Sequence, residues 1–185
     1  LADAMRHCAE DPQPLLDSYG LDAARLAEPR ARLSIPRYMR LGHSAIQQCG
    51  EPGLGLLMGQ TSRLSQLGLA GVTAMQAPTV REAARALIRF EPLYASNYRG
   101  QSSLHEDAQG AWLRFYSISP YNAYNRFVVD SVLASWAQQL CKLAQQALPV
   151  EKVQIEFPAP DYAVQYTALF ACPVEFASEH NQLRL

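Results

Sequence analysis

The sequence predicts an α+β domain in which helices pack on a small, mostly antiparallel sheet. Apolar residues recur at three- and four-residue steps over 35–49 and 124–148, which is the spacing of a helix with a buried face. They alternate with other residues over 111–118 and 153–157, as in strands. Because the helical and strand segments are interleaved irregularly along the chain, an α+β arrangement is expected.

The first 28 residues are expected to form short helices that Asp11-Pro12, Pro14 and Gly20 interrupt. With the connector that follows them, they make residues 1–33 a helical N-terminal part. A chain of 185 residues has the size of one domain, so a single domain over residues 1–185 is predicted.

The segment from residue 34 to residue 75 is expected to be mainly helical. Pro36 suits the first turn of a helix and Gly50 suits its end. A short apolar helix or turn follows over 53–62. Segment 67–75 contains small apolar residues, and its pattern fits a strand as well as a helix.

The next helix is predicted to begin at Thr79, which forms a capping box with Glu82. Pro92 is expected to end or kink this helix. The residues predicted to point inward are Ala83, Ala86, Leu87, Phe90 and Tyr94.

Residues 99–105 and 111–118 are predicted to form a hairpin around Asp107–Gly110. Alternation sends Leu113 and Phe115 to one side of the second strand. The other side carries large aromatic, charged and apolar residues: Trp112, Arg114, Tyr116 and Ile118.

The 124–148 helix is predicted to be the longest one, with Pro149 at its end. Its expected apolar stripe consists of Val128, Val132, Trp136, Leu140, Leu143 and Ala147. A strand over 153–157 follows, and Asp161 is predicted to cap a helix that runs to Phe170.

Composition indicates a folded chain that does not bind DNA by itself. Hydrophobic residues make up 49% of the chain and charged residues 18%, which supports a core. Lys plus Arg number 16 against 17 Asp plus Glu, so the net charge of −1 lacks the basic excess of a nucleic-acid-binding domain. No apolar run approaches the ~20 residues of a membrane span, and no signal-peptide pattern is present, so a cytoplasmic location without membrane contact is expected.

Motifs for catalysis, metals and nucleotides are incomplete, so no enzyme and no metal site is predicted. The four histidines lack paired ligand spacing, and the four widely spaced cysteines contain no C-x-x-C pair. Gly42–Ile46 lacks the closing glycine of a nucleophile elbow, which makes a small hydrolase the weakest hypothesis. Gly53-x-Gly55-x3-Gly59 follows a helix instead of a strand, so its glycines are expected to allow close packing.

Candidate ligand-binding residues come from the region between 94 and 136, where aromatic and polar side chains concentrate. Ligand pockets combine apolar walls with a few polar groups, and an arginine beside aromatic rings can hold a carboxylate bidentately. For each residue alone, a well-packed core or hairpin rim is at least as good an explanation. The candidates are Tyr94, Arg114, Tyr116, Arg126 and Trp136.

The end of the chain carries the most informative motif. The spacing Tyr166-x3-Phe170-x-Cys172-Pro173-Val174-x-Phe176-x4-Asn181-x-Leu183 is expected to give a helix, a tight turn and two strands. It resembles the closing segment of the N-terminal effector-binding (arabinose-binding-like) domain of AraC-type bacterial transcription regulators. Three further segments, Gly50–Leu56, Gly68–Gly71 and Ala77–Ala83, are similar to that family in the same order, so the resemblance covers about residues 15 to 185.

The resemblance implies a regulatory, ligand-binding domain of a cytoplasmic, homodimeric bacterial transcription regulator. A small-molecule effector of unknown identity would bind here, with no cofactor. A helix-turn-helix DNA-binding domain would follow residue 185, so DNA would be contacted only through that missing C-terminal domain. The implied fold is similar to haem-NO-binding and vinyl-reductase-type sensor folds.

The alternative is a stand-alone sensor domain that binds a hydrophobic cofactor such as haem. Tyr94–Arg99 is one residue too long for the Tyr-x-Ser-x-Arg pattern that clamps haem propionates. A visible absorption band from the purified protein would favour this alternative.

Overall fold

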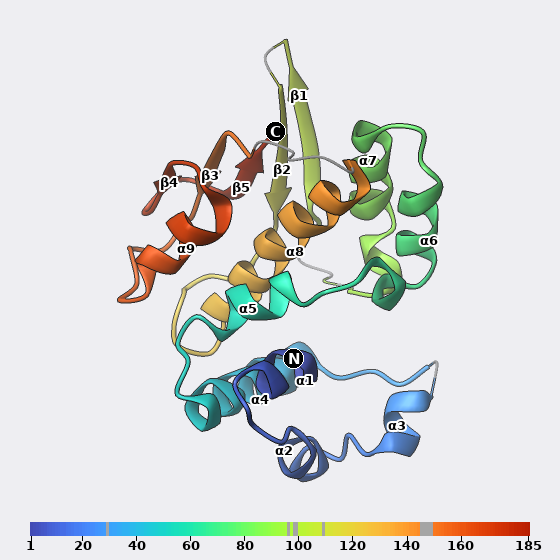
Figure 1. Ribbon diagram of the computed structural model, residues 1–185, viewed down its shortest axis with the longest axis vertical. Helices are drawn as coiled ribbons and strands as arrows, with labels where there is room; N and C mark the ends of the chain where they lie inside the picture. Colours follow the sequence, from blue (N-terminus) through green and yellow to red (C-terminus); the bar gives the residue numbers. More distant parts are fainter. Residues whose placement is uncertain (29, 96, 98–99, 109, 145–149) are drawn as a thin grey trace.

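The computed structural model describes residues 1–28, 30–95, 97, 100–108, 110–144 and 150–185. These residues form an α+β domain, as predicted (Figure 1). The α-helices are α1 (Ala2–His7), α2 (Gln13–Ser18), α3 (Ala23–Ala27), α4 (Ile35–Cys49), α5 (Leu54–Gln60), α6 (Leu69–Gln76), α7 (Val80–Arg89), α8 (Arg126–Ala144) and α9 (Ala163–Phe170). The strands are β1 (Ser103–Asp107), β2 (Gly110–Phe115), β3 (Lys152–Gln154), β4 (Val174–Glu175) and β5 (Asn181–Arg184), and short 3-10 helices span Leu64–Leu67 and Glu91–Leu93.

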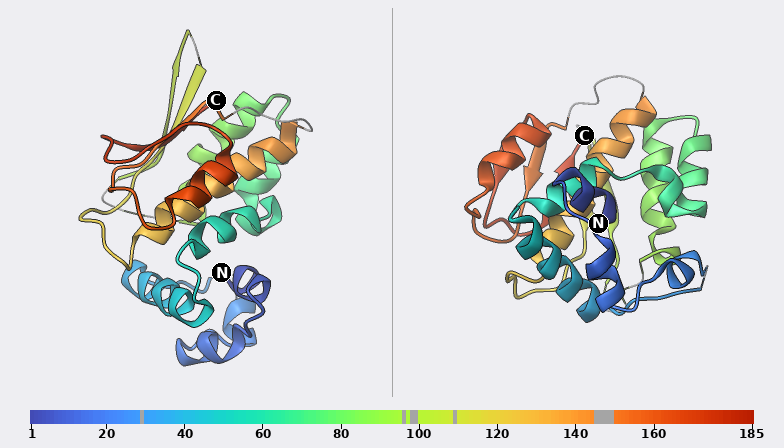
Figure 2. Two further views of the ribbon diagram at one scale, coloured as in Figure 1. Left: turned by 60° about the vertical axis from the view of Figure 1, so that its left-hand side comes forward. Right: turned by 60° about the horizontal axis from the view of Figure 1, so that its bottom comes forward.

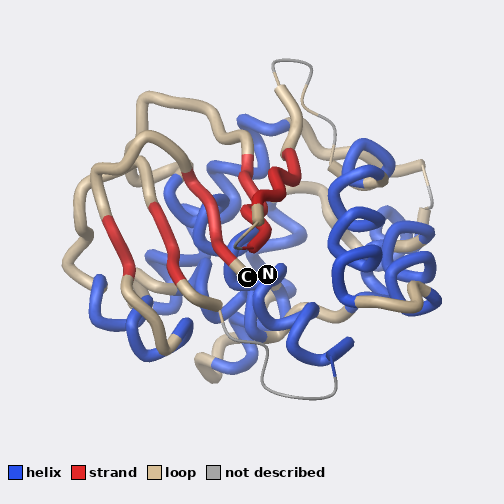
Figure 3. Tube along the Cα trace, turned by 90° about the horizontal axis from the view of Figure 1, so that it is seen from above, coloured by secondary structure: helices blue, strands red, loops and turns tan. Residues whose placement is uncertain are grey.

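The strands form one sheet in the order β1-β2-β5-β3-β4, and only the β3–β4 pair within it is parallel. The last strand of the chain therefore lies in the middle of the sheet, between the hairpin and β3. Seen from above, the strands run side by side, and helices lie next to the sheet that they form (Figure 3). The predicted hairpin and closing strands are thus confirmed.

Helix α8 lies at the centre of the molecule (Figure 1). It packs against α5, β2 and β5, among other elements. The prediction of a single apolar stripe was incomplete, because α8 also buries Asp130, Ser131 and Gln139. A helix covered on several sides buries residues all round its axis, including polar ones that find hydrogen-bond partners.

Glycines allow α5 to approach α8 closely. A Cβ atom added to Gly55 would lie 2.6 Å from the carbonyl oxygen of Phe127, and one added to Gly59 would lie 2.7 Å from the backbone nitrogen of Ser135. Both distances are shorter than van der Waals contact. The packing role predicted for these glycines is confirmed.

The first helices form a separate group beside α4, away from the sheet (Figure 2). A small apolar cluster of Ala4, Met5, Ala45 and Leu54 joins α1 to α4 and α5. Pro14 does not interrupt this part of the chain. It lies in the first turn of α2, where the missing amide hydrogen is not needed.

The structure decides one open local prediction and corrects two others. Segment 67–75, whose pattern fits a strand as well as a helix, is mainly helix α6. Asp161 does not cap α9, since the N-cap residue is Tyr162. Tyr94 does not point inward, because α7 ends at Arg89 and the 3-10 helix at Pro92 redirects the chain, which leaves 38% of Tyr94 exposed.

The predicted end of the long helix at Pro149, and residues 96, 98 and 99 of the Tyr94–Arg99 motif, lie outside the described residues. Within the residues that are described, no helix has both the length and the hydropathy needed to cross a bilayer. The four cysteines, all of which lie in the described part of the chain, form no disulfide bond with one another.

Candidate functional site

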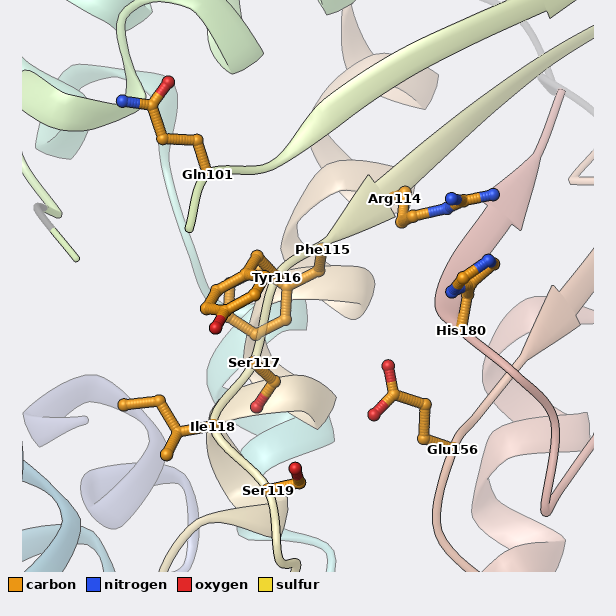
Figure 4. Close-up of a pocket in the computed structure, with 9 residues that line it drawn as sticks. All are labelled: Gln101, Arg114, Phe115, Tyr116, Ser117, Ile118, Ser119, Glu156 and His180. Carbon is orange, nitrogen blue, oxygen red and sulfur yellow. The ribbon is translucent and has the colours of Figure 1, made fainter. Parts of the chain in front are cut away.

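A pocket of about 460 Å³ lies at one end of the sheet. The antiparallel register pairs Phe115 at the end of β2 with Asn181 at the start of β5, and Gln154 of β3 pairs with Gln182 of β5. Segments that are distant in sequence therefore meet at this end of the sheet. The lining residues are Gln101, Arg114, Phe115, Tyr116, Ser117, Ile118, Ser119, Glu156 and His180 (Figure 4).

Arg114 is held in the pocket wall by one edge of its guanidinium group. Its Nε donates a hydrogen bond to Oε1 of Gln182 at 3.0 Å, and Nε2 of Gln182 donates to Oε1 of Gln154 at 2.5 Å. These residues lie on the sheet face away from α8. The bonded Nε fixes the orientation of the guanidinium, whose terminal nitrogens point toward the side of the pocket where His180 lies (Figure 4).

Glu156 is positioned by a second hydrogen-bond network. Tyr121 donates its hydroxyl to Oε2 of Glu156 at 2.5 Å, and Nδ2 of Asn181 donates to the Tyr121 hydroxyl oxygen at 2.7 Å. The backbone amide of Glu156 donates to Oδ1 of Asn181 at 3.0 Å. Burial and the neighbouring Glu156 raise the pKa of Tyr121 well above its usual range, so its hydroxyl stays a donor.

The loop that follows β2 is held by Asn125, a residue only 4% exposed. Its Nδ2 donates to the carbonyl oxygens of Ile118 at 2.9 Å and Pro120 at 3.0 Å, while its Oδ1 accepts from the Asn122 amide at 2.8 Å. One buried amide therefore fixes the backbone of the loop that forms one pocket wall.

The wall near Gln101 is held by buried Glu91. The amide and hydroxyl of Ser102 donate to the Glu91 carboxylate at 3.1 and 2.9 Å. Burial raises the pKa of Glu91, against the effect of these hydrogen bonds. Gly100 passes against the ring of Tyr116, where a side chain would collide with it.

The structure brings two of the predicted candidates into the pocket, Arg114 and Tyr116. Trp136 of α8 lies behind the wall and packs edge-on against Phe115, with ring centroids 6.2 Å apart. Arg126 is not among the residues that line the pocket, and its Cζ lies 5.7 Å from the centroid of the ring of Phe157, the residue after Glu156. Tyr94 is not among the residues that line the pocket.

Sequence reasoning missed Glu156, His180 and Gln101. A weak signal existed for Glu156, because it is a charged residue between the buried residues Ile155 and Phe157 of an alternating segment. His180 directly precedes the closing strand. The sequence position of Glu156 or His180 does not show which residues lie beside it, since the pairing of β2, β3 and β5 creates the site.

A second polar network is buried between α8 and α9. Asp130 is 0% exposed and accepts hydrogen bonds from the hydroxyls of Tyr162, at 2.9 Å, and Tyr166. Burial raises the pKa of Asp130 to about 7, although both tyrosines and the charge of Arg126 act to lower it. The charge of Arg126, whose guanidinium also lies over the Phe157 ring, therefore acts on this network.

The pocket offers groups for binding: a guanidinium, a carboxylate, an imidazole, hydroxyls and an aromatic ring. None of the ion pairs formed within the described part of the chain involves Arg114 or Glu156. Among the described residues, no group of three or more His, Cys, Asp or Glu side chains is placed to hold a metal ion.

A family model described as the arabinose-binding domain of AraC transcription regulator, N-term, matches residues 10–185. The chain belongs to this family. The predicted resemblance is therefore confirmed, and this AraC-type domain belongs to a family of transcription-regulator domains rather than of enzymes.

One curated protein is similar to the chain in sequence, and one solved structure is similar to it in fold. The chain is 27% identical over 185 residues to the ornithine utilization regulator of Pseudomonas aeruginosa. This alignment covers 100% of this chain and 54% of that protein. The crystal structure of the transcriptional regulator CdpR from Pseudomonas aeruginosa superposes with a TM-score of 0.57 at 16% identity, over 83% of this chain and 55% of that one. This AraC-type domain thus shares its fold with CdpR and spans about half the length of both relatives.

Proposed function

We propose that this AraC-type domain senses a small-molecule effector and controls a helix-turn-helix DNA-binding domain in the same full-length protein. The observation that carries the proposal is a half-open pocket with ordered polar walls in a domain of this family. The net charge of −1 supports a division of labour in which DNA is contacted elsewhere.

The effector would bind at the end of the sheet. Arg114 and Tyr116 would touch it, while Trp136 and Arg126 would support the walls from α8. Tyr94 would contribute through the 3-10 helix that also carries Glu91, the residue that holds Ser102 beside Gln101.

Regulation requires the effector to bind one arrangement of the full-length protein better than another, because equal affinity for both shifts nothing. Strand β5 lies between His180, which lines the pocket, and Leu185, whose backbone pairs with Ala111. A ligand that contacts the start of β5 would therefore act on the segment that follows it in the full-length protein. The full-length protein would be a cytoplasmic homodimer.

The relative named for ornithine utilization makes amino acids the first class to screen. The experiment has two steps. Thermal shift of the 185-residue chain with amino acids, fatty acids and sugars identifies a ligand. Fluorescence anisotropy then measures the affinity of the full-length protein for its promoter DNA with and without that ligand.

The expected result is a change in DNA affinity of about 5-fold or more, the usual scale of coupling between two sites. A ligand that stabilises the domain but leaves DNA affinity unchanged would contradict the regulatory role.

A further inference from the structure

We infer that the pocket selects small molecules that carry both a carboxylate and an ammonium group, as free amino acids do. Arg114 would hold the carboxylate and Glu156 the ammonium group. This inference rests on the proposed function, since it names the chemical class of the effector at the same pocket.

The guanidinium of Arg114 is prepared for a carboxylate. Gln182 accepts from Nε at 3.0 Å, so the bond to the sheet uses one edge of the group. The terminal nitrogens provide the fork that binds carboxylates bidentately. Figure 4 shows Arg114 and His180 extending on the same side of the pocket.

The carboxylate of Glu156 is prepared for an ammonium group. Oε2 accepts the Tyr121 hydroxyl at 2.5 Å, and the Glu156 backbone is fixed through Asn181. Oε1 receives no hydrogen bond from this network. Figure 4 shows the carboxylate pointing toward the space beside Ser117 and below His180.

The two charges act together as a selection device. Both lie on partly buried side chains of one pocket, and neither belongs to an ion pair among the described residues. A ligand with one charge would pair with one of the two protein charges and would bury the other without a partner, which is costly. A ligand with both charges satisfies the two sites, so the pocket favours it over singly charged analogues.

Size and apolar lining agree with this class. A pocket of about 460 Å³ is at the small end of ligand sites. Phe115, Tyr116 and Ile118 offer an apolar wall for the carbon chain of the ligand.

The test compares molecules that share a five-carbon chain and differ in charge. Norvaline carries both groups at one end of the chain, ornithine adds a second ammonium group at the other end, and 5-aminopentanoate carries one group at each end. Pentanoate carries only the carboxylate and pentylamine only the amine. Isothermal titration calorimetry on the 185-residue chain measures each affinity. At least one doubly charged compound is expected to bind about 10-fold or more tightly than both singly charged ones.

Pocket variants assign the binding to the two residues. Arg114→Gln and Glu156→Gln should each weaken the best compound by about 10-fold or more, the scale of one lost charge-assisted hydrogen bond. The side-chain oxygen of glutamine can still accept the hydrogen bond from Tyr121, so the Glu156→Gln variant is expected to fold. Arg40→Gln and Glu28→Gln remove exposed charges on α4 and next to α3, and should leave the affinity unchanged.

Two results would overturn the inference. One is equal binding of pentanoate or pentylamine and the doubly charged compounds. The other is no binding of any of the twenty amino acids or the panel compounds, with unfolding midpoints proving that the protein is folded. If a sugar or fatty acid instead binds and alters DNA affinity, the effector class is wrong and the proposed function stands. If amino acids bind without altering DNA affinity, the class stands and the proposed function is wrong.

Discussion

Asp130 is a residue whose protonation the fold changes strongly. It is fully buried in α8, where a charged carboxylate is costly, and two tyrosine hydroxyls compensate only in part. Its pKa rises from 3.8 to about 7. Folding therefore takes up a proton at this site near neutral pH.

The sign of the resulting pH dependence follows from linkage. The folded state binds this proton more tightly than the unfolded state, so the contribution of Asp130 to stability is full below the unfolded pKa. That contribution is lost as the pH rises from about 4 to about 7. We predict that the free energy of unfolding of the wild type falls over this window by up to roughly 1.4 kcal/mol per pH unit, relative to Asp130→Asn.

Urea unfolding at several pH values measures this difference. Asparagine resembles a protonated carboxyl group in shape and can both donate and accept, so the variant is expected to fold. Parallel pH profiles of the wild type and Asp130→Asn would show that Asp130 is already ionised in the folded protein.

Arg126 acts on this network and packs on the residue that follows Glu156 in the chain. Its charge acts to lower the pKa of Asp130, and its guanidinium lies over the ring of Phe157. We predict that Arg126→Ala weakens effector binding more than folding: a loss of about 10-fold in affinity against a loss of about 1 kcal/mol or less in stability. Calorimetric titration and urea unfolding measure the two quantities.

Lys142→Ala provides the matched control, because Lys142 is exposed in the last turn of the same helix. Equal losses of stability and ligand binding in Arg126→Ala would refute a specific role for Arg126.

At the scale of single residues, the sequence predicted part of the site. Arg114 and Tyr116 were predicted because aromatic and polar side chains concentrate between 94 and 136, and both line the pocket. Alternation places Arg114 opposite the buried Leu113 within β2, while Tyr116 lies just beyond the end of this strand at Phe115. Glu156 and His180 could not be predicted as site residues, since no local sequence pattern indicates which strand they face. Asp130 also escaped prediction, because a buried carboxylate within an apolar helix has no distinctive pattern.

At the scale of elements, the sequence predicted helix ends correctly where neighbouring residues determine them. The side chain of Thr79 accepts a hydrogen bond from the backbone amide of Glu82, as expected of an N-cap residue. Gly50 ends α4 in the left-handed conformation, with φ of 60°. The fate of 67–75 was not predictable, because its small apolar residues fit a strand or a helix equally well. Neighbouring elements decided the outcome, since α6 packs against α7.

The packing of α5 on α8 gives a test at this scale. Helix propensity alone predicts that Gly55→Ala stabilises the protein by roughly 0.5–1 kcal/mol. The added Cβ would meet backbone atoms of Phe127 and the Cβ of Asp130, so we instead expect destabilisation by about 1–3 kcal/mol.

Urea unfolding decides between the two signs. Gln60→Ala on the exposed end of the same helix should stay within about 0.5 kcal/mol of the wild type. A stabilised Gly55→Ala variant would mean that α5 and α8 lie farther apart than the structure has them.

At the scale of the whole molecule, the fold class and family were predictable and the pocket was not. Alternating and helical patterns gave the α+β class, and the closing motif around Asn181 gave the family resemblance. The pocket combines residues 101, 114–119, 156 and 180, which meet only because β5 inserts between β2 and β3. Sheet order is a long-range property that no local pattern specifies.

The central claim is that this end of the sheet receives the effector. Amide chemical-shift mapping of the isotope-labelled chain, titrated with the tightest-binding compound of the panel, reports where the ligand lies. The claim predicts that the largest shifts occur at Ser117, Glu156 and His180, and that Glu156→Gln reduces them at the same ligand concentration. Largest shifts in α1–α4, or around Val80 and Leu185, with the pocket amides unchanged, would contradict it.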